Sequence, residues 1–182
     1  LNSAAQEGIE QLVRTSFYNH FSSKNYYDIE PLEVDRSVRL LEEQYGKRWR
    51  QIPARQLGKF FHADFLVYGE VLDLKKLYLL FYSQIALSVK ASMVSTGSGA
   101  VVWEDSAVRR LHSGDLPLHP LALVPAAVRS GMNIADERKM DLVERTCRAL
   151  VATMPDAGPA PPGQYRADIQ VASFTDKGRA YQ

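Results

Sequence analysis

The chain has 182 residues, 46% of them hydrophobic and 24% charged, which is typical of an ordinary globular domain with enough apolar material for a core. Its 22 basic and 21 acidic residues leave a formal net charge of +1, which argues against binding nucleic acid or an anionic membrane through bulk charge. A single cysteine excludes an intramolecular disulfide, and the longest apolar stretch, 77–89, is too short to span a bilayer.

The first third of the chain predicts three helices and one short strand. Apolar residues spaced three and four apart over 4–22 predict an amphipathic helix, and the apolar run 26–29 predicts a strand. A second helix is expected to be capped by Asp35 and to stop at Gly46. Pro53, at a first helical position, is expected to open a third, short helix.

The middle of the chain predicts three consecutive antiparallel strands. The first strand is expected over 63–74. Apolar residues then occupy the odd positions of 79–93, while the later even positions are mostly polar, a period of two that indicates a long strand with one solvated face. A turn at 96–99 leads into a returning strand over 100–108. We therefore predict an α/β fold, with a mixed sheet whose meander spans about 63–108 and is packed by helices.

The last third is expected to hold one clear helix and one strand. Prolines and glycines over 113–133 predict an irregular connecting segment that contains one short helical piece at most. A helix over 136–154 is expected to start at Asp136, and its apolar stripe runs from Met140 to Met154. Cys147 lies on that stripe, so we interpret it as a buried thiol rather than a reactive nucleophile.

The predicted domain organisation has three parts. Residues 1–154 form the α/β domain, and 155–166 form a linker rich in proline and glycine. Residues 167–182 supply an extra strand or the start of an incomplete following domain, because a lone strand cannot bury itself.

One motif within the meander is specific enough to suggest a family. Its residues are His62-Ala63-Asp64-Phe65-Leu66-Val67-Tyr68-Gly69-Glu70-Val71, Tyr82-Ser83, 89–94, 96–99 and Val102-Trp103-Glu104. It resembles the "ADxxxYGxV" strand and the "GxxxWE" ending of bacterial envelope lipoproteins of the meningococcal surface-lipoprotein type. The likeness covers about 5–155, and its specific part is 62–106. More loosely, the chain is similar to the amino-terminal domain of TolB and to curli-secretion and exopolysaccharide-export lipoproteins.

The resemblance implies a TolB-like fold, a location in the cell envelope on the periplasmic side of the outer membrane, and association with itself and with other envelope proteins. The family's first strand and its lipidated cysteine do not occur in these residues, so a lipid anchor is expected on a segment upstream. In the motif itself, Gly69 is expected to leave room for a bulky ring, which Trp103 could supply from a neighbouring strand.

The sequence contains no motif that indicates catalytic, cofactor-binding or metal-binding residues. The histidines lie in no nucleophile or zinc motif, and the turn at 96–99 lacks the lysine and helix of a phosphate loop. His112 and His119, with Asp115 between them, are a conceivable zinc site, but a second ligand pair is missing. The sequence therefore predicts that the protein is not an enzyme.

We accordingly expect a non-enzymatic accessory or assembly subunit for secretion, surface presentation or envelope integrity, which associates through exposed strand edges or the region of Trp49. One alternative is a periplasmic small-ligand-binding module with a pocket lined by Tyr68, Tyr78 and Tyr82. Another is a nucleic-acid binder, although a solvated loop is the simpler interpretation of its basic residues. That binder would use a basic cluster interleaved with Tyr45 and Trp49, namely Lys47, Arg48, Arg50, Arg55 and Lys59.

Overall fold

The computed structural model describes residues 3–79, 82–113, 127–157 and 168–176. Within these ranges, only the backbone is described at 3–7, 75–79, 82–83, 112–113, 127–136 and 168–176. The elements in chain order are α1 (Ser3–Phe21), η1 (Ser22–Lys24), β1 (Tyr27–Asp28), α2 (Pro31–Tyr45), η2 (Gly46–Gln51), α3 (Ala54–Phe61), β2 (Phe65–Leu79), β3 (Tyr82–Ser95), β4 (Val101–Ser113), α4 (Ala127–Thr153) and β5 (Asp168–Asp176).

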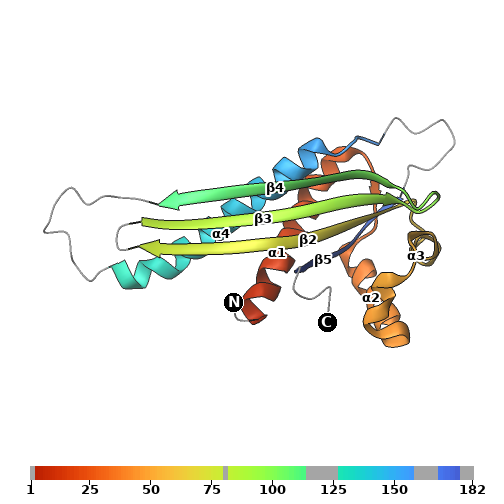
Figure 1. Cartoon of the computed structure of the whole chain (residues 1–182), viewed down its shortest axis with the longest axis horizontal. Coiled ribbons are helices and arrows are strands. Elements are labelled where there is room, and N and C mark those ends of the chain that lie inside the picture. Colours follow the sequence, from red (N-terminus) through yellow and green to blue (C-terminus); the bar gives the residue numbers. More distant parts are fainter. Residues whose placement is uncertain (1–2, 80–81, 114–126, 158–167, 177–182) are drawn as a thin grey trace, which may run out of the picture.

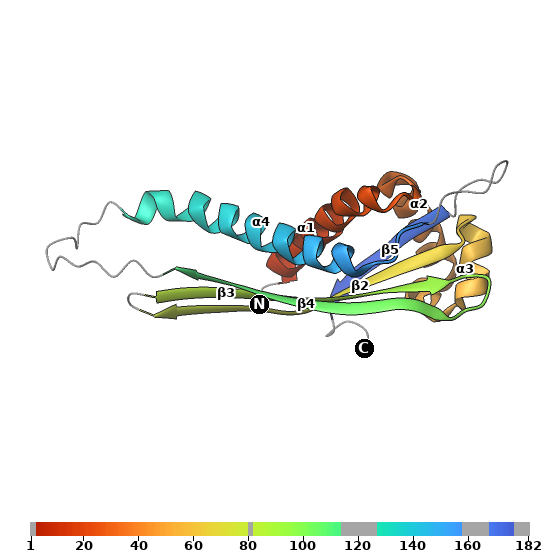
Figure 2. The same ribbon diagram turned by 90° about the horizontal axis from the view of Figure 1, so that it is seen from above.

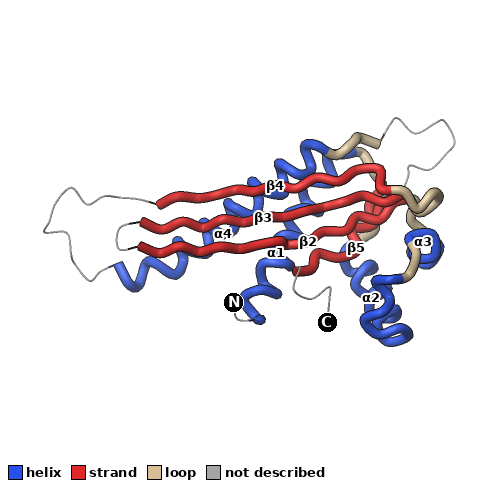
Figure 3. The backbone as a smooth tube through the Cα atoms, in the orientation of Figure 1, coloured by secondary structure: helices blue, strands red, loops and turns tan. Residues whose placement is uncertain are grey.

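The strands form one mixed sheet in the order β1-β5-β2-β3-β4 (Figures 1 and 3). β2, β3 and β4 are antiparallel neighbours, whereas β5 lies parallel to both β1 and β2. The predicted α/β fold with an antiparallel meander is therefore confirmed, although β2 and β4 extend five residues beyond the predicted ends 74 and 108. The strand that follows the proline-rich segment lies inside this sheet, between β1 and β2.

Two helices start at residues other than those predicted. α2 begins at Pro31 and not at a cap on Asp35, because proline fits the first helical position, where no amide donor is needed. Asp35 instead forms an ion pair with Arg14 of α1. α4 begins at Ala127, so Asp136 lies within the helix and does not start it. The predicted stop at Gly46 is confirmed, and its φ of 58° is one that glycine adopts readily.

The helices α1 and α4 cover one face of the sheet (Figure 2). The main core lies between these two helices and that face. The odd positions of β3 face this core, as the alternation predicted, because successive side chains of a strand point to opposite faces. The buried residues of this core are Ile9, Val13, Phe17, Phe21, Val67, Val71, Ile85, Leu87, Val89, Ala91, Met93, Trp103, Ala107, Leu142, Val143, Cys147, Leu150, Val151 and Met154.

Met140 is the exception to the apolar stripe predicted for α4. Its side chain is about half exposed, whereas the stripe is buried from Val143 onward. Among the described side chains of α4, burial in the main core begins at Leu142, two residues after Met140.

A second, smaller core lies at one end of the sheet, where α2, η2 and α3 gather beside the start of β2 (Figure 1). Trp49 is its largest buried residue, and the ring is only 1% exposed. Leu66 reaches this cluster from the side of β2 opposite Val67, which faces the main core. The buried members are Leu41, Trp49, Leu57, Phe61, Ala63 and Leu66.

The start of β2 is joined to the β3–β4 hairpin at Thr96. The Thr96 Oγ1 lies 2.7 Å from the carbonyl oxygen of Ala63 and 3.0 Å from that of Asp64, and the Thr96 amide donates to Asp64 at 2.9 Å. α3 presses on the same residue, because a Cβ built on Gly58 would lie 2.3 Å from the Cβ of Thr96. Only glycine permits this approach of helix to hairpin.

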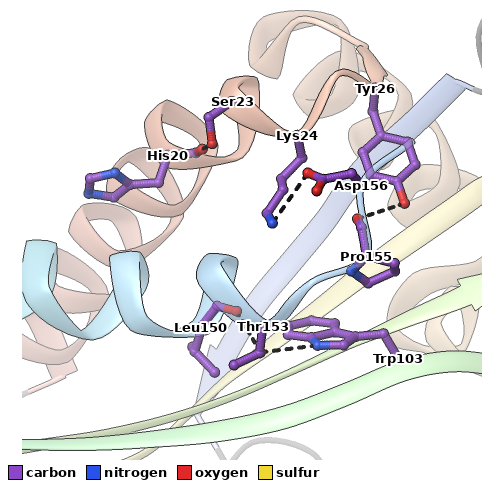
Figure 4. Close-up of polar contacts among 9 residues, drawn as sticks. All are labelled: His20, Ser23, Lys24, Tyr26, Trp103, Leu150, Thr153, Pro155 and Asp156. Atoms are coloured by element: carbon purple, nitrogen blue, oxygen red, sulfur yellow. Dashed lines mark hydrogen bonds and ion pairs between the residues drawn. The ribbon is translucent and has the colours of Figure 1, made fainter. Parts of the chain in front are cut away.

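The end of α4 is held from two sides (Figure 4). The indole N–H of Trp103 donates to Thr153 Oγ1 at 3.2 Å, which joins α4 to β4. Just beyond the helix, the Tyr26 hydroxyl donates to the Pro155 carbonyl oxygen at 3.1 Å, and Lys24 pairs with Asp156 at 3.3 Å. The first residues of the predicted linker are therefore bound to the α1–β1 connection; residues 158–166 of that linker lie outside the described residues.

Trp103 does not approach Gly69 from a neighbouring strand, as the motif suggested. Gly69 pairs with Ala91 of β3, and β3 separates β2 from β4. Trp103 pairs with Met93 and donates to α4. Whether Trp103 can reach Gly69 depends on which strands are neighbours in the sheet, and the motif does not encode the strand order.

Candidate functional site

The most distinctive surface of the molecule is the outer edge of β4. In the described part of the chain, β4 pairs with β3 on one side and with no strand on the other. The opposite side of the sheet is stepped, because β1 pairs with β5 at two positions and β5 pairs with β2 only from Phe65 to Val71. β4 has 13 residues, so its outer side presents a long row of backbone N–H and C=O groups, which is a template for another strand.

The side chains of β4 divide between the two faces of the sheet. Trp103 and Ala107 point to the helix-covered face and are buried. The alternate residues Glu104, Ser106 and Val108 are exposed on the other face. Three valines of this strand are unusually exposed for apolar residues: Val101 at 57%, Val102 at 47% and Val108 at 46%.

A β-bulge shapes the start of this strand. Met93 pairs with Trp103, but Val94 pairs with Val101, so Val102 is an extra residue in the ladder. Bulges are common at sheet edges, where they change the direction in which side chains point. From Trp103 to the end of the strand the register is regular.

Charged residues along β4 are arranged in two pairs of opposite sign. Glu104 and Asp105 lie near the start, and Arg109 and Arg110 lie four residues later. Glu104 pairs with Lys90 of β3 at 2.9 Å, and both side chains are substantially exposed. Arg109 donates to the carbonyl oxygen of its neighbour Val108 at 3.0 Å.

Asp105 links the edge strand to the end of α4. One carboxylate oxygen accepts the amide of Ser106 at 2.7 Å, and the other lies 2.8 Å from Thr153 Oγ1. Because Thr153 also accepts from Trp103, the helix end is bonded both to Trp103 and to Asp105 of β4. The edge strand is thus fixed in position without being covered.

Along β3 and β4, the sheet face opposite α1 and α4 is polar, whereas α2 and α3 pack beside the start of β2 (Figure 2). The even residues of β3 are partly exposed, as predicted for a solvated face, and include Ser88, Lys90 and Ser92. Among the described residues of this face, the exposed apolar side chain of Val108 lies on the edge strand itself, which makes the edge the candidate contact surface.

A hollow of about 330 Å³ lies between α1 and α2. Its α1 side is polar and its other side is apolar, and a volume of this size can hold a small ligand. Burial and a hydrogen bond with Asp28 raise the pKa of Tyr18, which lines the hollow, to about 12, so its hydroxyl is a donor at neutral pH. The lining residues are Gln11, Arg14, Thr15, Tyr18, Asn19, Ile29, Pro31 and Val34.

A second hollow, of about 550 Å³, is wider and lies beside α3 and the β3–β4 hairpin. Arg55 and Lys59 give it positive charge, and Asp64 also contributes to the lining. His62 ends α3 there with a left-handed φ of 54°.

Of the three tyrosines predicted to line a pocket, Tyr68 is the one whose side chain the structure describes. Tyr68 is half-buried and packs against the second core, and burial raises the pKa of its hydroxyl. The side chains of Tyr78 and Tyr82 lie outside the described residues. Neither hollow described above is lined by Tyr68.

The possible zinc ligands also lie outside the described residues, because the side chain of His112 and the whole of Asp115 and His119 are not described. His20 lies in the last turn of α1, where its carbonyl oxygen accepts the Ser23 hydroxyl at 2.8 Å (Figure 4). Among the residues that are described, no three histidine, cysteine or acidic side chains are grouped to hold a metal ion.

Of the two aromatic residues in the basic cluster, Trp49 is not available to stack on a base, whereas Tyr45 is 44% exposed. Trp49, which that hypothesis needs, is buried in the second core, and its indole N–H is directed to Glu42 at 3.4 Å. The Arg50 guanidinium lies 5.5 Å from the centre of the Trp49 ring and shields it further. For the same reason the Trp49 ring is not on the surface, and association through the region of Trp49 stays a prediction about its exposed neighbours.

Cys147 is fully buried between α4 and α1, as predicted, and its thiol lies 3.5 Å from the Val13 carbonyl oxygen. Burial raises the pKa of this thiol from 9.0 to about 12, so the group stays neutral and unreactive in the folded protein.

The free energy of unfolding should fall as the pH rises from 9 to 12, because the unfolded chain then releases the Cys147 proton that the folded chain retains. One such proton contributes a slope of about 1.4 kcal/mol per pH unit. Urea unfolding of the wild type and of Cys147→Ala at pH 8 and pH 10 measures this contribution. The variant should lose less stability between the two pH values, and equal losses would contradict the raised pKa.

Sequence reasoning missed the one arrangement that distinguishes β4. The signal was present as Glu104-Asp105 followed by Arg109-Arg110 within a single strand. Its meaning depends on β4 lying at the edge of the sheet, and the strand order is not visible in the sequence pattern.

Comparisons with known proteins assign no family, since no family model and no curated protein matches the chain. Two solved structures are similar at a low level. The lipoprotein GNA1162 of Neisseria meningitidis is 19% identical, with a TM-score of 0.37, and the match covers 55% of this chain and 67% of that one. A lipoprotein candidate of Caulobacter crescentus is 15% identical, with a TM-score of 0.31, and the match covers 76% and 89% of the two chains.

Both of these structural neighbours are thus described as bacterial lipoproteins, but at such scores the likeness assigns no function. Among the helices described, none combines the length and the apolar character needed to cross a bilayer.

Proposed function

We propose that this chain is a non-enzymatic subunit of a bacterial cell-envelope assembly, located on the periplasmic side of the outer membrane. It would serve secretion, surface presentation or envelope integrity by associating with itself and with other envelope proteins. A lipid anchor on an upstream segment would hold it at the membrane.

The observation that carries this proposal is the long outer edge of β4. Monomeric proteins usually protect such an edge with short strands, proline or a covering loop. Here 13 residues are available, and Val101, Val102 and Val108 add exposed apolar surface along them. An edge of this kind favours association with a second strand over the monomeric state.

The envelope location is supported by the sequence resemblance over 62–106. The motif residues serve the fold in this structure: Asp64 accepts the amide of Thr96, and Trp103 holds the end of α4. A non-enzymatic role is supported by the chemistry of Cys147, whose neutral, buried thiol is unsuited to nucleophilic attack.

Two measurements on the full-length gene product test the proposal. Cell fractionation should recover the protein with the outer membrane, and sedimentation of the purified protein should show a concentration-dependent oligomer. Recovery from the cytosol would overturn the envelope location. A strict monomer at high concentration would overturn self-association.

Small-ligand binding is the second candidate, favoured by the hollow between α1 and α2. A thermal-shift screen of small polar metabolites would test it, because a ligand that binds the folded state raises the unfolding temperature. The control is Thr15→Phe, which places a ring in the hollow from an exposed position of α1. A stabilising compound that acts equally on both proteins does not bind there.

A further inference from the structure

We infer that two copies of this chain pair β4 against β4, antiparallel, about a two-fold axis at Ala107. The inference rests on the proposed self-association and specifies its partner, strand and register. The result is a closed dimer in which the two sheets become one continuous sheet.

The bounds of the strand give the first argument for this register. β4 runs from Val101 to Ser113, and Ala107 is its middle residue. When a strand pairs antiparallel with its own copy about one residue, positions equally distant from that residue lie opposite each other. Pairing about Ala107 therefore sets the bounds of the two strands level, with Val101 opposite Ser113 and the bulge residue Val102 opposite His112 near the ends.

The charges give a second, independent argument. Pairing about Ala107 places Glu104 opposite Arg110 of the second copy, and Asp105 opposite Arg109. The symmetry repeats both contacts, so four acidic–basic pairs form. A shift of the register by one residue retains only one acidic–basic pairing and its symmetry copy, and a shift by two retains none.

The faces of the sheet agree with this arrangement. Glu104 and Arg110 lie on the polar face, and Asp105 and Arg109 lie on the face covered by helices, because side chains alternate along the strand. Each acidic residue therefore meets a basic residue on its own face. This requires a two-fold axis perpendicular to the sheet, with the helices of both copies on the same side.

The residues next to the axis suit a close contact. Ala107 is small and already buried, so two copies of it can lie opposite each other. Val108 lies on the polar face opposite Ser106 of the second copy, and it is a diagonal neighbour of the second Val108. Pairing thus covers an apolar side chain that is 46% exposed in the single chain.

The pattern of charges also explains why association would stop at two copies. Edge strands that avoid pairing carry charges that repel a second copy, whereas these charges attract one in a single register. The pairing consumes the β4 edge of each sheet. On the other side the sheet is stepped, because β1 pairs with β5 at two positions and β5 pairs with β2 only from Phe65 to Val71. A two-fold contact of this kind is closed and does not grow into a fibre.

Charge reversal tests the register by sedimentation velocity. Glu104→Arg alone places arginine opposite Arg110 of the other copy, and Arg110→Glu alone places two glutamates opposite each other. Each variant should weaken the dimer by at least about tenfold, because like charges opposite each other are unfavourable.

An equimolar mixture of the two variants should restore the dimer. In a mixed pair, the arginine introduced at position 104 of one chain lies opposite the glutamate introduced at position 110 of the other. The unchanged Glu104 and Arg110 meet at the symmetry-related position, so every contact again joins opposite charges.

Rescue by mixing is decisive because a fault within a single chain cannot be repaired by another chain. Lys47→Glu, an exposed reversal on η2, is the matched control and should leave the dimer unchanged. Circular dichroism of each variant checks that the chain is folded.

Cross-linking provides a second test that does not depend on charge. A mixture of Ser106→Cys and Val108→Cys chains, one of them tagged, should form a disulfide between the two kinds of chain on mild oxidation, since the positions lie opposite each other in this register. Ser98→Cys, in the exposed hairpin turn, should form none with either.

The outcomes separate the two proposals. If the unmodified protein is a strict monomer, both self-association and this register are overturned. If it is a dimer that neither responds to the reversals nor forms the mixed disulfide, self-association stands and the β4 register is overturned.

Discussion

Replacing Trp49 by alanine should lower the free energy of unfolding by about 3–5 kcal/mol, which is the cost typical of removing a large buried aromatic side chain. The ring is 1% exposed and is the largest buried side chain of the second core. Its loss leaves Leu41, Leu57 and Phe61 around a cavity that a six-residue 3-10 helix is poorly placed to fill.

Urea unfolding followed by circular dichroism measures this loss, at one protein concentration for all variants because self-association stabilises the folded state. Tyr45→Ala is the matched control, since it removes an aromatic ring four residues away that is 44% exposed. The control should change stability by no more than about 0.5 kcal/mol. A comparable small change for Trp49→Ala would contradict the placement of Trp49 in a core.

Replacing Gly58 by alanine should destabilise the protein by about 1–3 kcal/mol, even though alanine is the better helix former. The added Cβ would lie 2.3 Å from the Cβ of Thr96, so α3 or the hairpin must move. Thr96 cannot move freely, because its amide and hydroxyl are hydrogen-bonded to the start of β2. The steric cost therefore exceeds the gain of about 1 kcal/mol from helix propensity.

Gly8→Ala is the control for this prediction, because Gly8 is also helical but has no atom within 4 Å of an added Cβ. Only the propensity gain applies there, so this variant should become more stable by up to about 1 kcal/mol. Thermal unfolding of the two variants should thus shift in opposite directions. Shifts of the same sign would show that the contact between α3 and Thr96 is not limiting.

The parts of the fold that were predicted correctly depend on local patterns. The period of two in β3 is carried by residues close together in the chain, and burial of one face follows from it directly. The helix α1 was predicted for the same reason, since its buried residues repeat at three and four positions. Gly46 ended α2 as expected, because its φ of 58° is unfavourable for other residues.

The errors arose where two local signals competed or where no local signal exists. At the start of α2, the proline signal of Pro31 prevailed over the capping signal of Asp35. At the start of α4, Asp136 resembled a cap, yet the helix extends back to Ala127. Trp49 lay among basic residues that suggested a solvated loop, and only the packing of α2, η2 and α3 shows that its ring belongs to a core.

The sequence by itself determined the meander, the helix that carries the buried Cys147, and the opposite charges within β4, because all of these are properties of neighbouring residues. The tertiary structure decided that β5 enters the sheet between β1 and β2 and that β4 is left at its edge. Strand order depends on contacts between residues far apart in the chain, which no local pattern encodes. Because β4 lies at the edge of the sheet, its charged residues can face a second chain and form a candidate interface.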